Sequence, residues 1–283
     1  MAIALQNVNY IYGVGSGQEY HALKNINLEI GDGEFVGLVG HSGSGKSTLI
    51  QLFNGLIQPT TGKITWDGQD ISDRSFSKRA LRGQVGLVFQ YPEHQLFAES
   101  VLQDVEFGPR NLGLPNLQVE LRSFEALKTV GIGEELLDVS PLALSGGQKR
   151  RVAIAGVLAM QPKFLVLDEP MAGLDPEGHE EMLRIFRKLH EEQHITIVLV
   201  SHNMDDVARY AKRLLVMNHG EIVLDGTPAQ VFQYAEQLQQ IGLGVPQSTA
   251  LLRRIEAQTG EQIGSAITPE ECVDALHRWL EQR

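Results

Sequence analysis

A glycine-rich loop that begins at residue 40 has the residue types and spacing that bind phosphate. It fits the pattern GxxxxGK[ST], follows the apolar run Phe35–Val39 and precedes a helical pattern over 47–56. Glycines let backbone N–H groups turn towards phosphate oxygens, and the start of a helix adds partial positive charge. Lys46 would reach the β- and γ-phosphates of a nucleotide, and Ser47 would ligate Mg²⁺. The residues expected around the phosphates are Gly40, His41, Ser42, Gly43, Ser44, Gly45, Lys46, Ser47 and Thr48.

Two adjacent acids end the apolar run Phe164–Leu167. Because side chains alternate along a strand, Asp168 and Glu169 cannot share one task unless the chain bends between them. Asp168 suits the coordination shell of Mg²⁺, and Glu169 suits a base that polarises an attacking water. A strand that simply ends in two solvated acids is an equal alternative for this segment alone, and the nearby phosphate loop favours the catalytic interpretation.

The segment LSGGQ, residues 144–148, predicts a second anion site. Ser145 and the two glycines after it precede an apolar helical run, so a hydroxyl group, backbone N–H groups and a helix dipole would converge there. An ordinary helix N-cap is the better explanation when the segment is taken alone. Together, however, the phosphate loop, LSGGQ and the Asp-Glu strand, in this order, resemble the signature set of ABC-type ATPases.

Over roughly residues 1–230 the chain resembles an ABC transporter nucleotide-binding subunit. The resemblance implies an α/β P-loop NTPase with a RecA-like parallel-sheet core, an N-terminal antiparallel β portion and a helical subdomain. It also implies ATP and Mg²⁺ as cofactors, with each ATP bound between the phosphate loop of one subunit and the LSGGQ segment of another. The signature residues that would contact this nucleotide are Ser145, Gly146, Gly147 and Gln148.

Four further positions acquire roles from the same resemblance. Tyr12 is similar to the aromatic residue that stacks on adenine, and a half-buried strand tyrosine is the alternative. Gln90 resembles the Q-loop glutamine at Mg²⁺ and the attacking water, and Asp175 lies in a segment similar to the D-loop. His202 resembles the switch histidine at the γ-phosphate, although a lone histidine at a strand end is more often structural or exposed. The expected catalytic residues are Lys46, Gln90, Glu169 and His202, and the expected Mg²⁺ ligands are Ser47, Gln90 and Asp168.

The implied reaction is hydrolysis of ATP by in-line attack of water on the γ-phosphate, with Glu169 as the general base. ATP binding would close a pair of subunits, and hydrolysis would let the pair open. A soluble ABC ATPase of DNA repair or translation is an alternative from another class. One uninterrupted cassette, the lack of sustained heptads and a net charge of −11 argue against it.

The arrangement of apolar runs predicts how these motifs are positioned. Runs of strand length alternate with helical patterns up to about residue 225, as in the βαβ units of a parallel sheet. Asn218-His219-Gly220 predicts a hairpin turn, and Thr227-Pro228 predicts the start of a capped helix. We expect an ATPase domain over 1–240 and, by resemblance to related ATPases, a helical dimerisation extension over 247–283.

The interval from about 91 to 160 contains no convincing strand and indicates a helical subdomain inserted in the α/β core. A helix is predicted over 116–130, because apolar residues recur there at spacings of three and four: Leu117, Leu121, Phe124, Leu127 and Val130. At the start of the interval, Pro92 biases the preceding Tyr91 towards extended backbone. In the C-terminal extension, the helix that begins near Pro269 is expected to carry Val273, Leu276, Trp279 and Leu280 on one face.

Composition restricts the class of protein. The 283 residues carry a net charge of −11, which argues against broad binding to DNA, RNA or anionic lipid. Cys272 is the only cysteine, so an intrachain disulfide is excluded and a reducing compartment fits. No apolar run approaches the roughly 18 to 20 residues of a membrane span. These features predict a cytoplasmic protein, and the resemblance to ABC transporter subunits implies that it lies peripherally at the cytoplasmic face of the cell membrane, attached through a partner.

A narrower resemblance rests on residues 90–113 and 169–178, which are similar to the ATPases of energy-coupling factor transporters, importers of vitamins and some transition-metal ions. The first segment resembles the second of the two paralogous ATPases found in many of these systems, and Met171 departs from the threonine expected there. The implied partners are a paralogous ATPase, a membrane scaffold subunit and substrate-binding membrane subunits. A homodimeric ATPase of another importer, such as one for cobalt or nickel, is the alternative.

The scaffold subunit would contact the chain through coupling helices near residue 96. Leu96 and Phe97 would lie in the groove for such a helix; packing inside the helical subdomain is the alternative. The acids that could meet arginines on the coupling helix are Glu93, Glu99, Asp104 and Glu106.

Overall fold

A parallel sheet forms the centre of the molecule, of which the computed structural model describes residues 2–281; Met1 and residues 282–283, the end of the expected extension, lie outside it. The six strands follow the order β10-β9-β3-β8-β7-β6. All neighbours pair in parallel except β10, which pairs antiparallel with β9. The strands are β3 (Phe35–Gly40), β6 (Val85–Val88), β7 (Phe164–Asp168), β8 (Thr196–Val200), β9 (Arg213–Asn218) and β10 (Glu221–Gly226).

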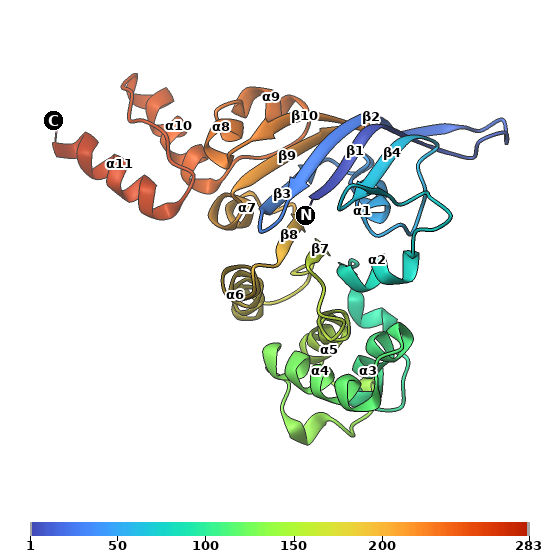
Figure 1. Cartoon of the computed structure of the whole chain (residues 1–283). Helices are drawn as coiled ribbons and strands as arrows, with labels where there is room; N and C mark the ends of the chain where they lie inside the picture. The colour runs from blue at the N-terminus through green and yellow to red at the C-terminus, as the bar shows by residue number, and fades with distance from the viewer. Residues whose placement is uncertain (1, 282–283) are drawn as a thin grey trace.

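A second, antiparallel sheet is formed mostly by the N-terminal part of the chain. Its order is β2-β1-β4-β5, and the β1–β2 hairpin projects to one side of the molecule (Figure 1). The strands are β1 (Ala2–Tyr12), β2 (Tyr20–Gly31), β4 (Thr61–Trp66) and β5 (Gln69–Asp70). Together, the parallel core and the antiparallel N-terminal portion confirm the predicted α/β fold.

Helices cover both faces of the parallel sheet and form two further regions. In Figure 1, α3, α4 and α5 make a lower lobe. Helices α10 and α11 project at the upper left, on the side away from the β1–β2 hairpin. None of the helices within 2–281 is long and apolar enough to span a bilayer. The helices are α1 (Lys46–Phe53), α2 (Lys78–Gln84), α3 (Val101–Leu112), α4 (Asn116–Thr129), α5 (Gly146–Leu158), α6 (Pro176–Gln193), α7 (Met204–Tyr210), α8 (Pro228–Phe232), α9 (Ala235–Gln240), α10 (Gln247–Thr259) and α11 (Pro269–Glu281), with short 3₁₀ turns η1 (Pro92–Gln95), η2 (Glu134–Leu136) and η3 (Pro141–Ala143).

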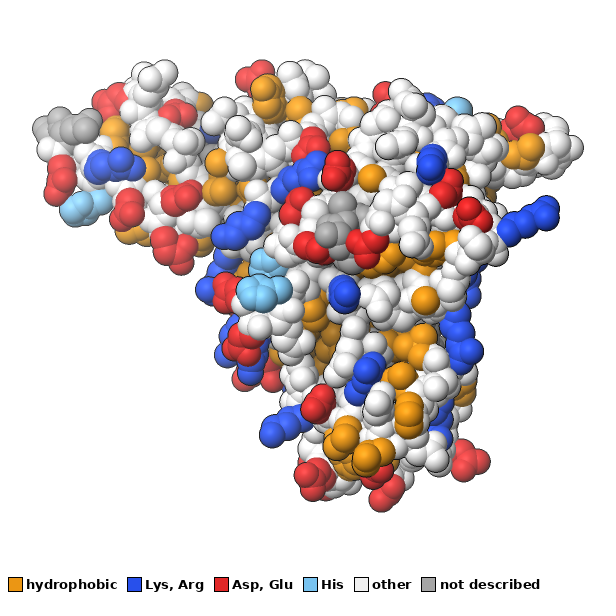
Figure 2. Space-filling view, viewed as in Figure 1, with side chains coloured by type: hydrophobic (Ala, Val, Ile, Leu, Met, Phe, Trp, Pro, Cys, Tyr) orange, Lys and Arg blue, Asp and Glu red, His pale blue; other side chains and the backbone are white. Residues whose placement is uncertain are grey.

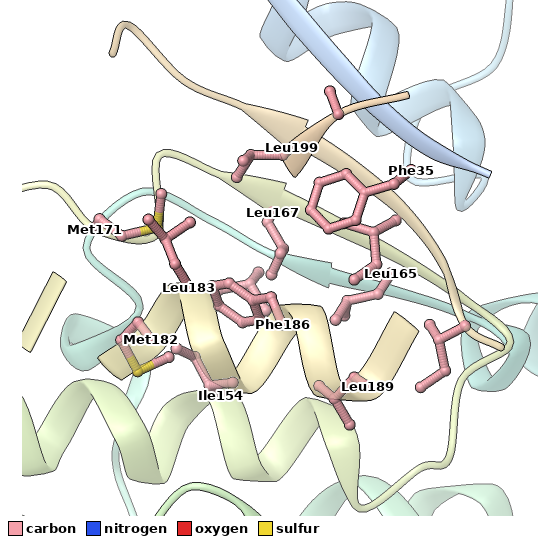
Figure 3. Packing of buried hydrophobic residues seen from close by; sticks show 14 of the residues in the cluster. Phe35, Ile154, Leu165, Leu167, Met171, Met182, Leu183, Phe186, Leu189 and Leu199 are labelled. Atoms are coloured by element: carbon pink, nitrogen blue, oxygen red, sulfur yellow. The ribbon is translucent and has the colours of Figure 1, made fainter. Parts of the chain in front are cut away.

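The central strands β3, β6, β7 and β8 are buried on both faces and are mostly apolar, whereas the edge strand β10 is half exposed. On β7, Leu165 and Leu167 point into one core cluster, while Phe164 and Val166 point into the other. Figure 3 shows the first cluster, in which Phe186 of α6 packs beside these leucines. Met171, the departure from the expected threonine, is 6% exposed and belongs to the same cluster. The Met171 side chain therefore packs in the hydrophobic core.

The predicted helix over 116–130 is present as α4, but the predicted apolar face is wrong in part. Leu117 and Leu121 are 67% and 54% exposed. Leu127 and Val130 of the predicted face are buried, as expected, and they are joined by Val119 and Ala126, which the prediction left out. In Figure 2 the lower lobe accordingly carries apolar side chains at its surface. The predicted stripe is therefore confirmed in the second half of the helix and wrong in the first half, where Val119 faces the core in place of the leucines.

The C-terminal helix shows a similar difference. Its buried residues are Cys272 and Ala275, whereas Val273 and Leu280 of the predicted apolar face are 65% and 60% exposed. Helix α10 packs on α11 and closes a small separate core around Leu252. The predicted apolar face of α11 is thus only partly buried within the described chain.

Local backbone predictions have mixed outcomes. His219 and Gly220 have φ values of 48° and 86°, as a tight hairpin turn between β9 and β10 requires, and Thr227 caps α8 in a reciprocal capping box. Tyr91 is not extended: its φ and ψ are 55° and 56°. The bias from Pro92 is overridden, which points to contacts that hold this turn.

Candidate functional site

The phosphate loop connects β3 to α1 and is packed so closely that its first and last glycines cannot be replaced. A Cβ atom on Gly40 would lie 2.6 Å from the Met217 carbonyl oxygen, and one on Gly45, whose φ is 106°, would lie 2.7 Å from that of Ala22. At the mouth of the loop, Ser42, Gly43 and Ser47 are exposed. The turn after β9 supports the loop from outside, since Gly220 N donates to Ser44 O at 2.9 Å and the His41 ring lies 3.0 Å from Asn218 Oδ1.

Lys46 is folded back across this loop. Its Nζ atom donates to the Gly40 carbonyl at 2.6 Å and to the His41 carbonyl at 3.1 Å, and the residue is only 7% exposed. Burial lowers the pKa of Lys46, and the negative charges of Glu169 and Asp168 partly oppose that shift. A phosphate group in the loop would supply the counter-charge that this buried ammonium group favours.

The two acids at the end of β7 can both face one site because the chain bends between them. Glu169 has a φ of 49°, a left-handed conformation, and its N–H donates to the Val200 carbonyl at 3.0 Å. This is the bend that adjacent acids require if both are to face one site. Burial, followed by repulsion from Glu169, raises the pKa of Asp168 to about 6.

Glu169 lies between Gln90 and His202. Its Oε1 atom is 2.7 Å from His202 Nε2, and its Oε2 atom accepts a hydrogen bond from Gln90 Nε2 at 3.3 Å. The three residues follow β6, β7 and β8, which are neighbours in the sheet. Parallel strands bring their carboxyl ends to one edge, where ligands of open α/β sheets bind. Three segments distant in the sequence therefore meet at the predicted catalytic position.

The donor set suits Mg²⁺ bound together with phosphates. No group of three His, Cys, Asp or Glu side chains within residues 2–281 is arranged to hold a metal ion alone. Magnesium usually binds through one or two carboxylates and substrate phosphates, and it retains several waters. The raised pKa of Asp168 fits this mode, because a cation beside the carboxylate would relieve the cost of its burial next to Glu169.

Tyr12, the last residue of β1, lies beside the phosphate loop. Its ring is 41% exposed, packs edge-on against Tyr10 at 4.7 Å, and its hydroxyl lies 3.1 Å from Thr48 Oγ1. Sequence reasoning missed Tyr20, whose hydroxyl donates to the Gly43 carbonyl at 3.2 Å. Tyr20 faces Tyr12 across the β1–β2 hairpin, so the spacing of the hairpin was the signal that could have found it.

The LSGGQ segment begins α5 with a complete capping box. Ser145 Oγ accepts from Gln148 N at 3.3 Å, and Gln148 Oε1 accepts from Ser145 N at 3.0 Å. A Cβ atom added to Gly146 or Gly147 would meet nothing within 4 Å. Nothing in the described chain therefore demands glycine at these two positions, which leaves close approach by a ligand as a reason for them.

The structure does not bring the LSGGQ segment to the phosphate loop. Gly147 instead lines a groove of about 400 Å³ together with Gly173 and Asp175. Asp175 is exposed and caps α6 by accepting from Gly178 N at 2.7 Å. The two anion-binding helix starts lie in different parts of the chain, as they would if each served a different nucleotide.

Leu96 and Phe97 line an apolar groove of about 500 Å³ between α2, α3 and α5. Phe97 is 65% exposed and packs edge-on against Phe107 at 4.9 Å, whereas Leu96 is half-buried against the core. Leu96 therefore packs inward, as the alternative predicts, while Phe97 stays at the surface, and its contact with a coupling helix remains a prediction.

The acids near this groove differ from expectation. Glu93 is bound by Arg150, and Glu106 is buried and paired with Arg110. Asp104 accepts backbone hydrogen bonds from Phe97 N and Ala98 N at 3.0 and 2.8 Å, so it shapes the loop. Three of the four acids thus have partners within the chain, and Glu99 is the exposed one; a contact between these acids and arginines of a coupling helix remains a prediction.

Comparison with known proteins agrees with this geometry. A family model described as ABC transporter matches residues 23–172. The chain is 52% identical over 280 residues to the energy-coupling factor transporter ATP-binding protein EcfA2 of Caldanaerobacter subterraneus subsp. tengcongensis, covering 99% of this chain and 98% of that protein. It is 55% identical over 256 residues to the EcfA2 protein of Clostridium perfringens, covering 90% of each.

Solved structures give the same result. The cbiO1 protein of Clostridium perfringens, part of the ABC transporter complex cbiONQ, is 41% identical with a TM-score of 0.73 and covers 92% of this chain and 98% of its own. The ATP-binding cassette MJ0796, in a dimeric post-hydrolysis state bound to ADP and Pi, is 32% identical with a TM-score of 0.72 and covers 80% and 98%. The chain belongs to the ABC transporter family and, within it, to the ATP-binding proteins of energy-coupling factor transporters.

Proposed function

We propose that this chain binds and hydrolyses ATP to power an energy-coupling factor importer for vitamins or other micronutrients. The observation that carries the proposal is the contact of Gln90 and His202 with the two oxygens of Glu169, beside the phosphate loop. A carboxylate held from both sides at the carboxyl edge of the sheet is suited to orient one water molecule.

Different residues of the chain have separate roles in ATP binding and hydrolysis. Lys46 and the N–H groups at the start of α1 bind the phosphates, and Tyr12 contacts the adenine base. Glu169 accepts the proton of the attacking water, and His202 turns towards the γ-phosphate. Mg²⁺, held by Ser47, Gln90 and Asp168, supplies charge neutralisation on the phosphates when it is bound.

A second ATPase subunit completes the site in this proposal. The open backbone at Gly146 and Gly147 and the exposed Asp175 face outwards from this chain. Ser145 and Gln148 would then bind the partner's nucleotide, with a paralogous ATPase as the partner. The extension over 247–283 presents Val273 and Leu280 at the surface, which supports a role in this pairing.

The groove at Leu96 and Phe97 is the proposed contact with the membrane scaffold subunit. It is apolar, and it is rimmed by the arginines Arg79 and Arg82 as well as by Asp104. An amphipathic coupling helix would bury Phe97 there and anchor the chain at the cytoplasmic face of the membrane. Substrate-binding membrane subunits would contact the scaffold and not this chain.

The test is Glu169→Gln in the assembled transporter complex. The amide keeps the shape of the side chain and cannot accept the proton, so ATP turnover should fall at least 100-fold while ATP affinity stays within about twofold. Glu191→Gln, at an exposed ion pair on α6, is the matched control and should hydrolyse ATP normally. Undiminished turnover in Glu169→Gln would refute its assignment as the base.

A further inference from the structure

Arg150, five residues after Ser145 on α5, contacts the segments that follow both Gln90 and Glu169. We propose that Arg150 is a positioning residue that holds Gln90 and Glu169 together, so that the LSGGQ helix sets the geometry of the hydrolytic centre of its own chain. This inference rests on the proposed function, because it assigns Glu169 as the base that Arg150 positions.

One edge of the guanidinium group binds Glu93 in a bidentate pair. Arg150 Nε lies 3.0 Å from Oε2 of Glu93, and Nη2 lies 2.6 Å from Oε1. The arginine and glutamate side chains are 5% and 16% exposed, so the pair is largely removed from water. Paired geometry of this kind fixes direction as well as distance.

The other edge of Arg150 binds the turn after Glu169. Nη1 donates to the Pro170 carbonyl at 3.5 Å and makes a shorter hydrogen bond to the Ala172 carbonyl. Glu93 lies three residues beyond Gln90, and Pro170 directly follows Glu169. The contact between Gln90 Nε2 and Glu169 Oε2, at 3.3 Å, therefore closes a ring of interactions that runs through Arg150.

Both of the anchored segments are strained. Tyr91, beside Gln90, has a φ of 55°, and Glu169 has a φ of 49°. A left-handed conformation is unfavourable for a residue with a side chain, and it persists only where neighbouring groups impose it. Arg150 touches both turns, and its guanidinium carbon lies 6.0 Å from the centre of the Tyr91 ring. It is therefore placed to impose both conformations.

The chemistry requires arginine rather than any cation. A planar guanidinium group carries five N–H donors in a fixed fork, so it can serve a carboxylate and two carbonyl oxygens at once. A lysine ammonium group at the same place lacks this planar fork, so it could not bind both segments in the same geometry. Since Ser145 caps the same helix, a shift of α5 at the LSGGQ end would be transmitted through this fork to Gln90 and Glu169.

The test compares Arg150→Lys with Arg151→Lys in the assembled complex. Arg151 is the matched control, because it is the next residue of α5 and forms its own bidentate pair with Glu181 away from Gln90 and Glu169. Loss of positioning should lower kcat of Arg150→Lys by roughly 10- to 100-fold, since small displacements at a reacting centre have effects of this size. The Kd for ATP should change less than about twofold, and Arg151→Lys should match the wild type.

A double-mutant cycle separates positioning from general stability. If Arg150 acts through the Gln90–Glu169 contact, Arg150→Lys should lower kcat less in a Gln90→Ala background than in the wild type. Glu93→Gln, which weakens one edge of the fork without touching α5, should lower kcat with an unchanged Kd for ATP. This second variant keeps the test decisive where Arg150→Lys fails to fold.

Wild-type kcat in Arg150→Lys or in Glu93→Gln would overturn the inference. So would equal losses in Arg150→Lys and Arg151→Lys, or effects of Arg150→Lys and Gln90→Ala that simply multiply. These outcomes are distinct from failure of the proposed function, which would appear as absence of ATP turnover in the wild-type complex itself.

Discussion

His202 Nε2 lies 2.7 Å from Oε1 of Glu169, and the register of the parallel sheet explains this contact. Asp168 of β7 is opposite Val200 of β8, so the residues just beyond each strand emerge together at the carboxyl edge. The contact also requires the left-handed turn at Glu169, which sends this side chain towards β8 while Asp168 stays in the strand. Sheet register and one strained residue thus place Glu169 and His202 together.

Replacing Asp168 by Asn should stabilise the chain in the absence of nucleotide and Mg²⁺ while it abolishes ATP turnover. The native pKa of Asp168 is raised to about 6, from a reference value of 3.8, by burial and by Glu169. The folded state thus binds a proton more tightly than the unfolded state, and the free energy of unfolding falls as pH rises from about 4 to 6. Above pH 6 the ionised carboxylate lowers that free energy by roughly 2–3 kcal/mol.

Denaturant unfolding at pH 8 and at pH 5 provides the measurement. The gain in unfolding free energy from Asp168→Asn should be larger at pH 8, where the native carboxylate is charged, than at pH 5, where it is mostly protonated. Asp274→Asn, which changes an exposed acid on α11, is the matched control. A gain that is equal at both pH values would contradict the raised native pKa as its cause.

Tyr12 should contribute to ATP affinity through its ring. Stacking of a base on an aromatic side chain is worth about 1–3 kcal/mol, so Tyr12→Ala should weaken ATP binding at least about fivefold. Tyr12→Phe keeps the ring and loses only the hydrogen bond to Thr48, so its affinity should stay near the wild-type value. The affinities are measured by titration with a fluorescent ATP analogue. Equal affinity in Tyr12→Ala and the wild type would show that Tyr12 does not stack on the base and has only a structural role in β1.

Motifs with fixed chemistry were predictable from the sequence because their residue types allow few other uses. The phosphate loop, the acids after β7 and the hairpin at 218–220 occupy the expected positions. In each case a local rule decides the structure: glycine at a positive φ, a buried apolar strand, or a two-residue turn. The α/β alternation followed from the same short-range patterns.

Features that depend on which neighbour is present were not predictable. The buried stripe of α4 is set by how α4 packs on α3 and α5, and Val119 and Ala126 fit there while Leu117 stays exposed. Glu93 was expected at a partner's arginine because charge alone does not reveal that Arg150 is folded beside it. The conformation of Tyr91 is likewise a tertiary effect that overrides the local influence of Pro92.

Truncation of Leu96 and Phe97 to alanine should impair assembly with the membrane subunits while it spares ATP binding. Phe97 is 65% exposed in an apolar groove, so its loss removes contact area for a partner and little from the core. Leu117→Ala is the matched control, because Leu117 is 67% exposed on α4 and does not line this groove. Co-purification from detergent-solubilised membranes should recover the membrane subunits with Leu117→Ala and lose them with the double alanine variant. Normal recovery and transport in the double variant, with ATP affinity unchanged, would show that the scaffold subunit docks elsewhere.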